Sequence, residues 1–294
     1  MIHVLDLKFL GIDHAIAAFL IETKDGPVLI ETGPHSTFNH LEEQVKQVGF
    51  DINDIKHVLL THIHLDHAGA AWALARKGAK IFVHPFGAGH LEHPFKLMES
   101  ARRIYLDQMD YLWGEMHDIS GEQIIQPQDN QVYDIGGINF QALYTPGHAK
   151  HHIAWKIGKT LFSGDVAGVK IGDGPVVPPC PPPDINLEEW NDSIDLIVKS
   201  DVNEIYLTHY GKIKNIESHF EQLRTMLNDW GQWIKARWET ESIEEMTPKF
   251  SKYTEEQLRE LGVDDHGVKQ YEAANPSWMS VAGLVRYWKK KSEL

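Results

Sequence analysis

Hydrophobic positions in the first two thirds of the chain fall into short apolar runs separated by polar turns, which is typical of β-strands. Lys24-Asp25-Gly26 and Gly136-Gly137 are the clearest turns between such runs. The runs form two groups, which suggest the two quasi-twofold halves of an αββα sandwich. The predicted strands are 2–8, 15–23, 27–31, 56–60 and 80–84 in the first group, and 131–135, 138–144, 152–157 and 160–163 in the second.

Other segments repeat their apolar residues at the spacing of a helix. Asn186 is a candidate N-cap for one of them, and residues 168–184 are too rich in Gly and Pro to form a regular element. The predicted helices are 37–48, 68–76, 85–119, 187–199, 214–240 and 253–290. The stretch 85–119 is long for a connection, so we interpret it as a helical insertion. We expect a catalytic domain over residues 1–212 and a helical extension over 213–294 packed on it.

Three histidines and one aspartate lie close together shortly after the predicted strand 56–60, in the run His62-Ile63-His64-Leu65-Asp66-His67. Neutral imidazoles and carboxylates are ligands of divalent metals, zinc especially. Residues two apart in an extended chain point the same way, so His62 and His64 can hold one metal ion. Asp66 and His67 follow the turn and face a second position. The simpler alternative is a polar, histidine-rich turn in which Asp66 caps the next helix.

Three more apolar strands end in residues of the same type: His148, Asp165 and His209. A rigid scaffold commonly presents metal ligands and catalytic groups at strand ends. One such histidine would carry little information. Three together with the cluster at 62–67 predict a dinuclear metal site.

Charge and composition restrict the partners. The formal net charge is −14, and no basic run precedes Lys289-Lys290-Lys291, which disfavours nucleic acid. No apolar stretch is long enough for a membrane helix, and no signal peptide is visible at Met1. Cys180 is the single cysteine, so no intrachain disulfide can form. We expect a cytoplasmic protein with a small-molecule substrate and neither nucleic acid nor membrane as partner; the oligomeric state stays open, a homodimer included.

Five motifs together resemble those of the metallo-β-lactamase-fold hydrolases: HIHLDH at 62–67, TPGH at 145–148, SGD at 163–165, LTH at 207–209, and IETG at 30–33, where the family usually has Asp-x-Gly. The resemblance covers roughly residues 1–212 and implies a four-layer αββα sandwich. It also implies a division of the ligands. The first metal would be held by His62, His64 and His148, the second by Asp66, His67 and His209, with Asp165 bridging both.

The resemblance further implies a hydrolase that cleaves a small ester, lactone or thioester with a hydroxide bridging two metal ions. Bound metal lowers the pKa of water from about 15.7 to about 7. We expect zinc, with iron or manganese as alternatives, and we expect Asp66 to act in catalysis together with the metal-bound water. The substrate itself does not follow, because this fold serves many reactions.

Several residues near the motifs are candidates for the substrate pocket. We expect Tyr210, His90 and His152 to line it, together with the insertion 85–119 and the loop 168–184. Glu31 stands where the family has Asp; a hydrogen bond to a ligand imidazole is expected, and the extra methylene leaves its geometry open. Cys180 is expected to be a loop thiol without a role. His84, His93 and His151 have no assigned role.

Three other functions remain open. The first is a mononuclear iron oxidoreductase of the same fold, although the retained Asp66, His67 and His209 favour two metals. The second is a phosphodiesterase. The third is a catalytically silent binding protein, whose mark would be a lost ligand, and none is lost here.

Overall fold

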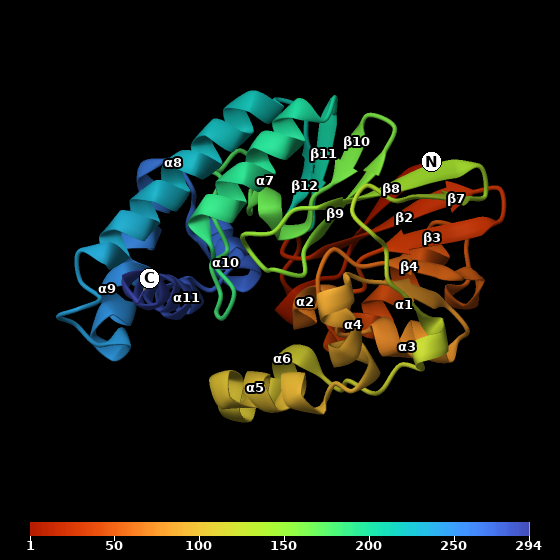
Figure 1. The fold of residues 1–294 in the computed structure, drawn as a ribbon, viewed down its shortest axis with the longest axis horizontal. Coiled ribbons are helices and arrows are strands. Elements are labelled where there is room, and N and C mark those ends of the chain that lie inside the picture. Colours follow the sequence, from red (N-terminus) through yellow and green to blue (C-terminus); the bar gives the residue numbers. More distant parts are fainter. Residues whose placement is uncertain (294) are drawn as a thin grey trace.

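Two six-stranded sheets lie face to face at the centre of the computed structural model, which describes residues 1–293 (Figure 1). Both sheets are mixed. The first has β1 to β3 antiparallel and β3 to β6 parallel, and in the second only β10 and β11 are parallel. In spatial order the first sheet contains β1 (Ile2–Asp6), β2 (Ala17–Thr23), β3 (Gly26–Ile30), β4 (His57–Leu59), β5 (Lys80–Phe82) and β6 (Ile124–Ile125). The second contains β12 (Gly211–Ile213), β11 (Glu204–Leu207), β10 (Thr160–Phe162), β9 (Ile153–Ile157), β8 (Ile138–Tyr144) and β7 (Val132–Ile135).

Alternate residues of the strands fill two different layers of core. Phe19 of β2 meets Phe162 of β10 between the sheets, with ring centroids 5.2 Å apart. Its neighbour Leu20 points to the opposite face and joins the core beneath the helices. Because both faces are buried, the strands consist of nearly continuous apolar runs. This arrangement is the four-layer αββα sandwich that the sequence predicts.

Helices cover the outer faces of both sheets and extend beyond the second sheet (Figure 1). They are α1 (Phe38–Gln47), α2 (Leu65–Ala68), α3 (Ala71–Arg76), α4 (Pro85–Glu92), α5 (Phe95–Tyr105), α6 (Met109–Trp113), α7 (Leu187–Lys199), α8 (Ile216–Lys235), α9 (Ile243–Glu260), α10 (Asp265–Ala274) and α11 (Ser277–Ser292). Short 3₁₀ turns occupy Phe9–Gly11, His35–Thr37, Ile52–Asp54, Leu106–Gln108, Gly121–Gln123 and Gly164–Ala167.

The helix predicted over 68–76 is divided in two, and the motif residues 65–67 lie within α2. The division falls at Gly69, where the chain passes close to Pro34. A Cβ at Gly69 would stand 2.4 Å from the carbonyl oxygen of Leu65 and 2.9 Å from Cα of Pro34. The close approach requires glycine, and it fixes the strand-to-helix turn that carries the motif.

Other predictions hold to different degrees. The helix 187–199 is confirmed, and the side chain of Asn186 accepts a hydrogen bond from the amide of Glu189 (3.1 Å). The insertion is helical only as far as Trp113, so the prediction that it is helical through residue 119 is wrong. Strands β6 and β12 were not predicted, since two or three residues carry too little alternation. The first half of α9 was also missed; Ser242 and Glu245 cap it reciprocally, and Pro248 lies inside it.

The helices from α8 onward pack on the second sheet through α7. Phe220, Leu223 and Leu227 form the buried face of α8. Helix α11 packs on α8 and α9 and reaches the proline-rich loop around Cys180. The division of the chain at residue 212 stays a prediction. No helix within residues 1–293 combines the length and the apolar character needed to cross a membrane.

Candidate metal centre

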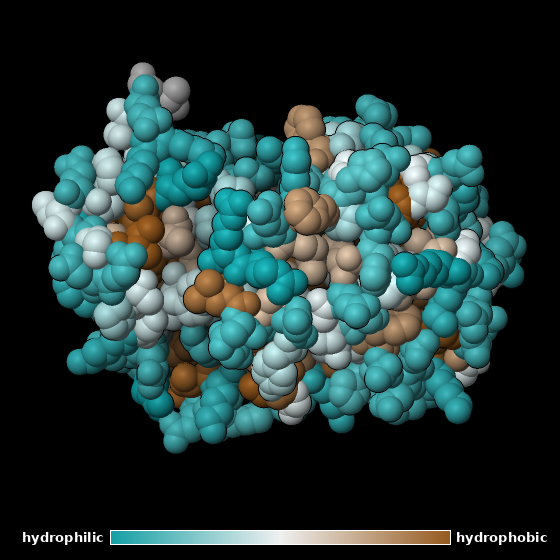
Figure 2. Space-filling model, turned by 90° about the horizontal axis from the view of Figure 1, so that it is seen from below, coloured by the Kyte–Doolittle hydropathy of each residue, from teal (hydrophilic) through white to brown (hydrophobic). Residues whose placement is uncertain are grey.

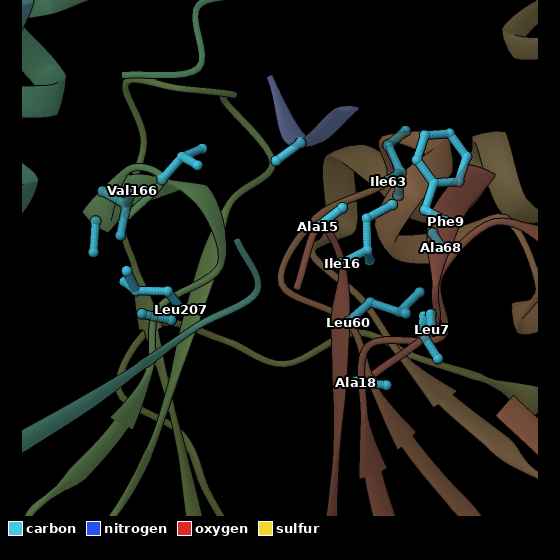
Figure 3. Packing of buried hydrophobic residues seen from close by; sticks show 14 of the residues in the cluster. Leu7, Phe9, Ala15, Ile16, Ala18, Leu60, Ile63, Ala68, Val166 and Leu207 are labelled. Carbon is cyan, nitrogen blue, oxygen red and sulfur yellow. The ribbon is translucent and has the colours of Figure 1, made fainter. Parts of the chain in front are cut away.

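The predicted ligands lie at the ends of strands from both sheets. Buried side chains anchor these ends: Leu60 and Ile63 follow β4, and Val166 and Leu207 lie on the side of the second sheet (Figure 3). Ile63, which lies between His62 and His64 in the chain, is buried in the core cluster. The polar side chains are therefore presented by a packed scaffold rather than by a mobile loop.

A first group of atoms converges from three segments of chain. Nδ1 of His64 lies 2.9 Å from Nε2 of His62 and 3.0 Å from Nε2 of His148. Oδ2 of Asp165 lies 3.4 Å from Nε2 of His148. These four residues bring ligand atoms within 4.8 Å of one another, as a single metal ion requires.

A second group lies directly beside the first. Nε2 of His67 and Nε2 of His209 are 3.4 Å apart, and Oδ2 of Asp66 lies 3.5 Å from the former and 3.4 Å from the latter. Oδ1 of Asp165 is 3.3 Å from Nε2 of His67 and 3.5 Å from Nε2 of His209. The two oxygens of Asp165 thus face different groups.

Hydrogen bonds on the outer side of the rings fix which nitrogen faces inward with a lone pair. Nδ1 of His148 donates to the carbonyl of Pro179 (2.8 Å), and Nδ1 of His209 donates to the carbonyl of Ala15 (2.7 Å). Nδ1 of His67 donates to Oε1 of Glu31 (2.9 Å). In the neutral form of each ring, this hydrogen bond leaves the inward nitrogen as an acceptor. Outer partners of this kind orient imidazole ligands in metal sites.

The second group then consists of two imidazole nitrogens and two carboxylates, all acceptors. While the rings are neutral, such atoms cannot hydrogen-bond one another, so a cation must lie between them: a proton on a ring, or a metal ion in its place. Burial opposes charge on the ring of His67, but Asp66, Asp165 and Glu31 outweigh it and raise its pKa well above the usual range. Burial likewise opposes the charge of Asp165, yet the surrounding imidazoles hold the pKa of that carboxyl low. This field favours positive charge, and the residues present fit divalent metal ions.

Glu31, of the motif at residues 30–33, lies directly behind the candidate ligands. Its side chain is fully buried. Its carboxylate accepts hydrogen bonds from the ring of His67 and from the hydroxyl and the amide of Thr61. The expected hydrogen bond of Glu31 is therefore present, and its partner is the candidate ligand His67.

A cavity of about 600 Å³ opens onto the cluster, with His64, Asp66 and Asp165 at its floor. Its walls come from four parts of the chain: residues 9–16, the insertion, the proline-rich loop and the junction of α10 with α11. Figure 2 shows the face of the molecule that carries the insertion, where apolar side chains stand among hydrophilic ones. The insertion and the loop therefore border the cavity as the sequence predicts.

Two of the three predicted pocket residues lie elsewhere. His90 lines the cavity, but Tyr210 and His152 do not. The ring of Tyr210 stacks on His14 (4.6 Å between centroids). His152 is fully buried behind the cluster, with Nδ1 hydrogen-bonded to the hydroxyl of Thr145 (2.8 Å). His152 directly precedes β9 and Tyr210 directly precedes β12, and neither residue lines the cavity.

Of the histidines without a predicted role, two have structural positions. His84 accepts from the amide of Phe86 at the start of α4 (3.1 Å). His93 ends α4 and is exposed. His151 lines the cavity, and its Nδ1 is a buried atom without a hydrogen-bond partner within residues 1–293. Cys180 is buried, and burial raises the pKa of its thiol, so it has no sign of reactivity.

Tyr105 borders the cavity as part of the predicted insertion. The segment Glu272–Met279, which borders the cavity at every residue except Ser277, was not predicted. The segment lies far along the chain, and its composition carries no signal of a site.

Comparison with known proteins agrees with this geometry. Residues 11–209 match the model of the metallo-beta-lactamase superfamily. The metallo-beta-lactamase fold-containing protein ST1585 of Sulfurisphaera tokodaii is 29% identical over 179 residues, 58% of this chain and 67% of that protein. Its crystal structure superposes with a TM-score of 0.67 at 20% identity, covering 96% of this chain and 97% of that chain.

Two relatives have named activities. An N-acyl homoserine lactonase of Bacillus thuringiensis is 27% identical over 172 residues, 50% of this chain and 60% of that protein. An atrochrysone carboxyl ACP thioesterase of Aspergillus fumigatus is 27% identical over 170 residues, 57% of this chain and 42% of that protein. The match therefore spans less than two thirds of either enzyme. The family model covers more than half of this chain, and the chain belongs to the metallo-beta-lactamase superfamily.

Proposed function

We propose that this protein is a metal-dependent hydrolase that cleaves an ester, a lactone or a thioester with two divalent metal ions, zinc in the first instance. The observation that carries the proposal is the carboxylate of Asp165, whose two oxygens face two separate groups of acceptors. His62, His64 and His148 would hold the first ion, and Asp66, His67 and His209 the second. Ions bound there would supply an activated water and polarise the carbonyl of the substrate.

The residues of this chain have distinct tasks in the proposed reaction. Asp165 keeps the two groups at a fixed separation. The carbonyls of Pro179 and Ala15 hold His148 and His209 in orientation through their Nδ1 hydrogens. Asp66 lies at the cavity floor with its side chain one fifth exposed (20%), so its carboxylate is placed to accept a proton from the attacking water.

The relatives with named activities support acyl chemistry. A lactonase and a thioesterase both add water to an acyl carbon; the first breaks a carbon–oxygen bond and the second a carbon–sulfur bond. Their similarity to this chain favours acyl substrates over phosphodiesters. The net charge of −14 also supports a small-molecule substrate over nucleic acid.

Metal content tests the proposal most directly. We expect two metal ions per chain by elemental analysis, one in His209→Ala, and a loss at both positions in Asp165→Asn. His93→Ala, at an exposed histidine, is the control and should keep two ions. A single tightly bound iron that is unchanged in His209→Ala would overturn the dinuclear assignment and favour the oxidoreductase.

Turnover tests the reaction class. A panel of aryl esters, lactones and thioesters should include a substrate whose hydrolysis falls in Asp165→Asn and is unchanged in His93→Ala. Preference for bis-aryl phosphates over every acyl compound would instead assign the protein as a phosphodiesterase.

A further inference from the structure

The cavity beside the candidate metal centre has an uneven distribution of polar groups. The candidate ligands His64, Asp66 and Asp165 lie at the floor. On the wall, the buried side chain of Asn275 is already hydrogen-bonded to the carbonyl of Pro178. Lys96 and Lys150 are exposed and therefore belong to the mouth. Between floor and mouth the walls are largely carbon. Such a cavity fits a ligand whose polar head lies at the floor and whose apolar body lies along the walls.

Aromatic side chains from distant parts of the sequence make the walls. Trp113 packs on Phe9 at 5.5 Å and on Tyr105 at 5.0 Å between ring centroids. Tyr105 in turn lies 6.0 Å from Trp278, and its hydroxyl donates to Sδ of Met279 (3.2 Å). The insertion and the start of α11 thus meet each other and form one continuous apolar wall.

Part of this wall lies outside the segment that the family model matches, which ends at residue 209. Residues 272–276, 278 and 279 line the cavity. The shape of the cavity therefore depends in part on residues outside the segment that the family model matches.

We propose that the insertion and the segment Glu272–Met279 together bind an extended apolar acyl group of the substrate, with its carbonyl at the floor. This inference rests on the proposed function and names the substrate class. A polar acyl group would leave its hydrogen-bonding atoms unpaired against these walls. An apolar chain loses no hydrogen bonds there, and each methylene that leaves water strengthens binding about fourfold.

Binding of ketones separates this inference from catalysis. We would titrate the metal-loaded protein with linear methyl ketones from butan-2-one to decan-2-one and follow tryptophan fluorescence, because Trp113 and Trp278 line the cavity. These compounds present a carbonyl and an alkyl chain but contain no bond to hydrolyse. The dissociation constant should fall about fourfold for each added methylene until the cavity is full. A series with no dependence on chain length would overturn the inference.

Filling the cavity from either wall should shorten the longest chain that gains affinity. Ala273→Trp acts from α10 and Ser100→Trp from α5, and both residues line the cavity. Lys269→Trp and Arg103→Trp are matched controls, since these exposed residues lie on the same helices but outside the lining. The longest chain that gains affinity should be shorter by two or more carbons in Ala273→Trp and Ser100→Trp, but not in the two controls. An equal optimum in all four variants would show that the chain binds elsewhere.

The outcomes also distinguish the two proposals. Chain-length-dependent binding without hydrolysis of any acyl compound would sustain the apolar site and refute the hydrolase. Hydrolysis with no chain-length dependence in either binding or turnover would sustain the hydrolase and refute the apolar site.

Discussion

Glu31 shows how one residue behind the candidate ligands shapes the site. Its carboxylate has no exposed surface and links three segments: the ring of His67, Thr61 at the end of β4, and the hydroxyl of Thr208 (3.4 Å). Its backbone is in the left-handed region (φ 64°), which is uncommon for a residue with a side chain. Strain of this kind is retained where the surrounding structure fixes it.

Replacing the charge of Glu31 while keeping its shape should weaken the second metal position. Glu31→Gln can still accept from His67, but it removes a negative charge from the field around the ring. We expect about a 10- to 100-fold loss of metal affinity, measured by competition with a chromogenic chelator. Glu43→Gln, at an exposed glutamate of α1, should have no effect. Equal affinities in the two variants would refute this role for Glu31.

The seven candidate ligands could be predicted from the sequence because each follows a recognisable apolar strand. The pocket residues could be predicted only in part: His90, the insertion and the loop line the cavity, but Tyr210 and His152 do not. Tyr210 directly follows a candidate ligand, as a pocket residue would, yet its ring stacks on His14. Tyr105 comes from the middle of an insertion, and only the packing of that insertion brings it to the cavity. Adjacency in sequence predicts position at strand ends, but not the direction of a side chain after the turn.

At the scale of elements, the proline-rich loop connects the metal centre with the C-terminal helices. The carbonyl of Pro179 accepts from the ring of His148. From the other side, Asn275 donates to the carbonyl of Pro178 (3.3 Å), and the hydroxyl of Ser280 accepts from the amide of Cys180 (3.3 Å). The sequence predicts an irregular wall here. The sequence does not predict that the C-terminal helices hold this loop, because the contacts join residues about a hundred positions apart. These contacts between the loop and the helices α10 and α11 are called the clamp below.

Gly283 of α11 provides a test of this clamp. A Cβ at this position would stand 2.0 Å from the carbonyl oxygen of Cys180, so Gly283→Ala must push the loop and the helix apart. We expect a loss of about 1–3 kcal/mol in the free energy of unfolding, together with weaker metal binding at the group that contains His148. Thermal unfolding and chelator competition measure the two effects.

Gly89 of α4 is the matched control. A Cβ there meets nothing within 4 Å, so Gly89→Ala should stabilise the protein by up to about 1 kcal/mol and leave metal affinity unchanged. If Gly283→Ala loses stability but binds metal normally, the loop does not orient His148.

At the scale of the whole molecule, the candidate metal centre joins the two sheets. His62 and His67 follow the first sheet, whereas Asp165 and His209 follow the second. Metal ions bound between them would tie the halves together and compensate the buried carboxylates. This consequence follows from the strand order, which the sequence predicts only as two groups of strands.

Removal of metal should therefore lower the stability of the entire fold. For an ion present at 100 times its dissociation constant, binding contributes about 2.7 kcal/mol, which corresponds to a decrease of about 5 °C in Tm. Differential scanning calorimetry before and after dialysis against a chelator measures the change, and added zinc should restore it. An unchanged Tm in a sample proven free of metal would contradict this coupling.

The clamp on the proline-rich loop also has a consequence for how the protein is made. All the candidate ligands have been synthesised once the ribosome passes His209, but the clamp begins only at Tyr271, which donates to the carbonyl of Pro175 (2.6 Å). At about 5–20 residues per second, several seconds separate the two events. During that interval the nascent chain carries all of its ligands while the loop behind His148 is still unanchored. A metal ion bound during that interval would meet a His148 ring whose partner, the carbonyl of Pro179, is not yet held in place. The affinity of the centre for metal would then rise once α11 has emerged and packed on the loop.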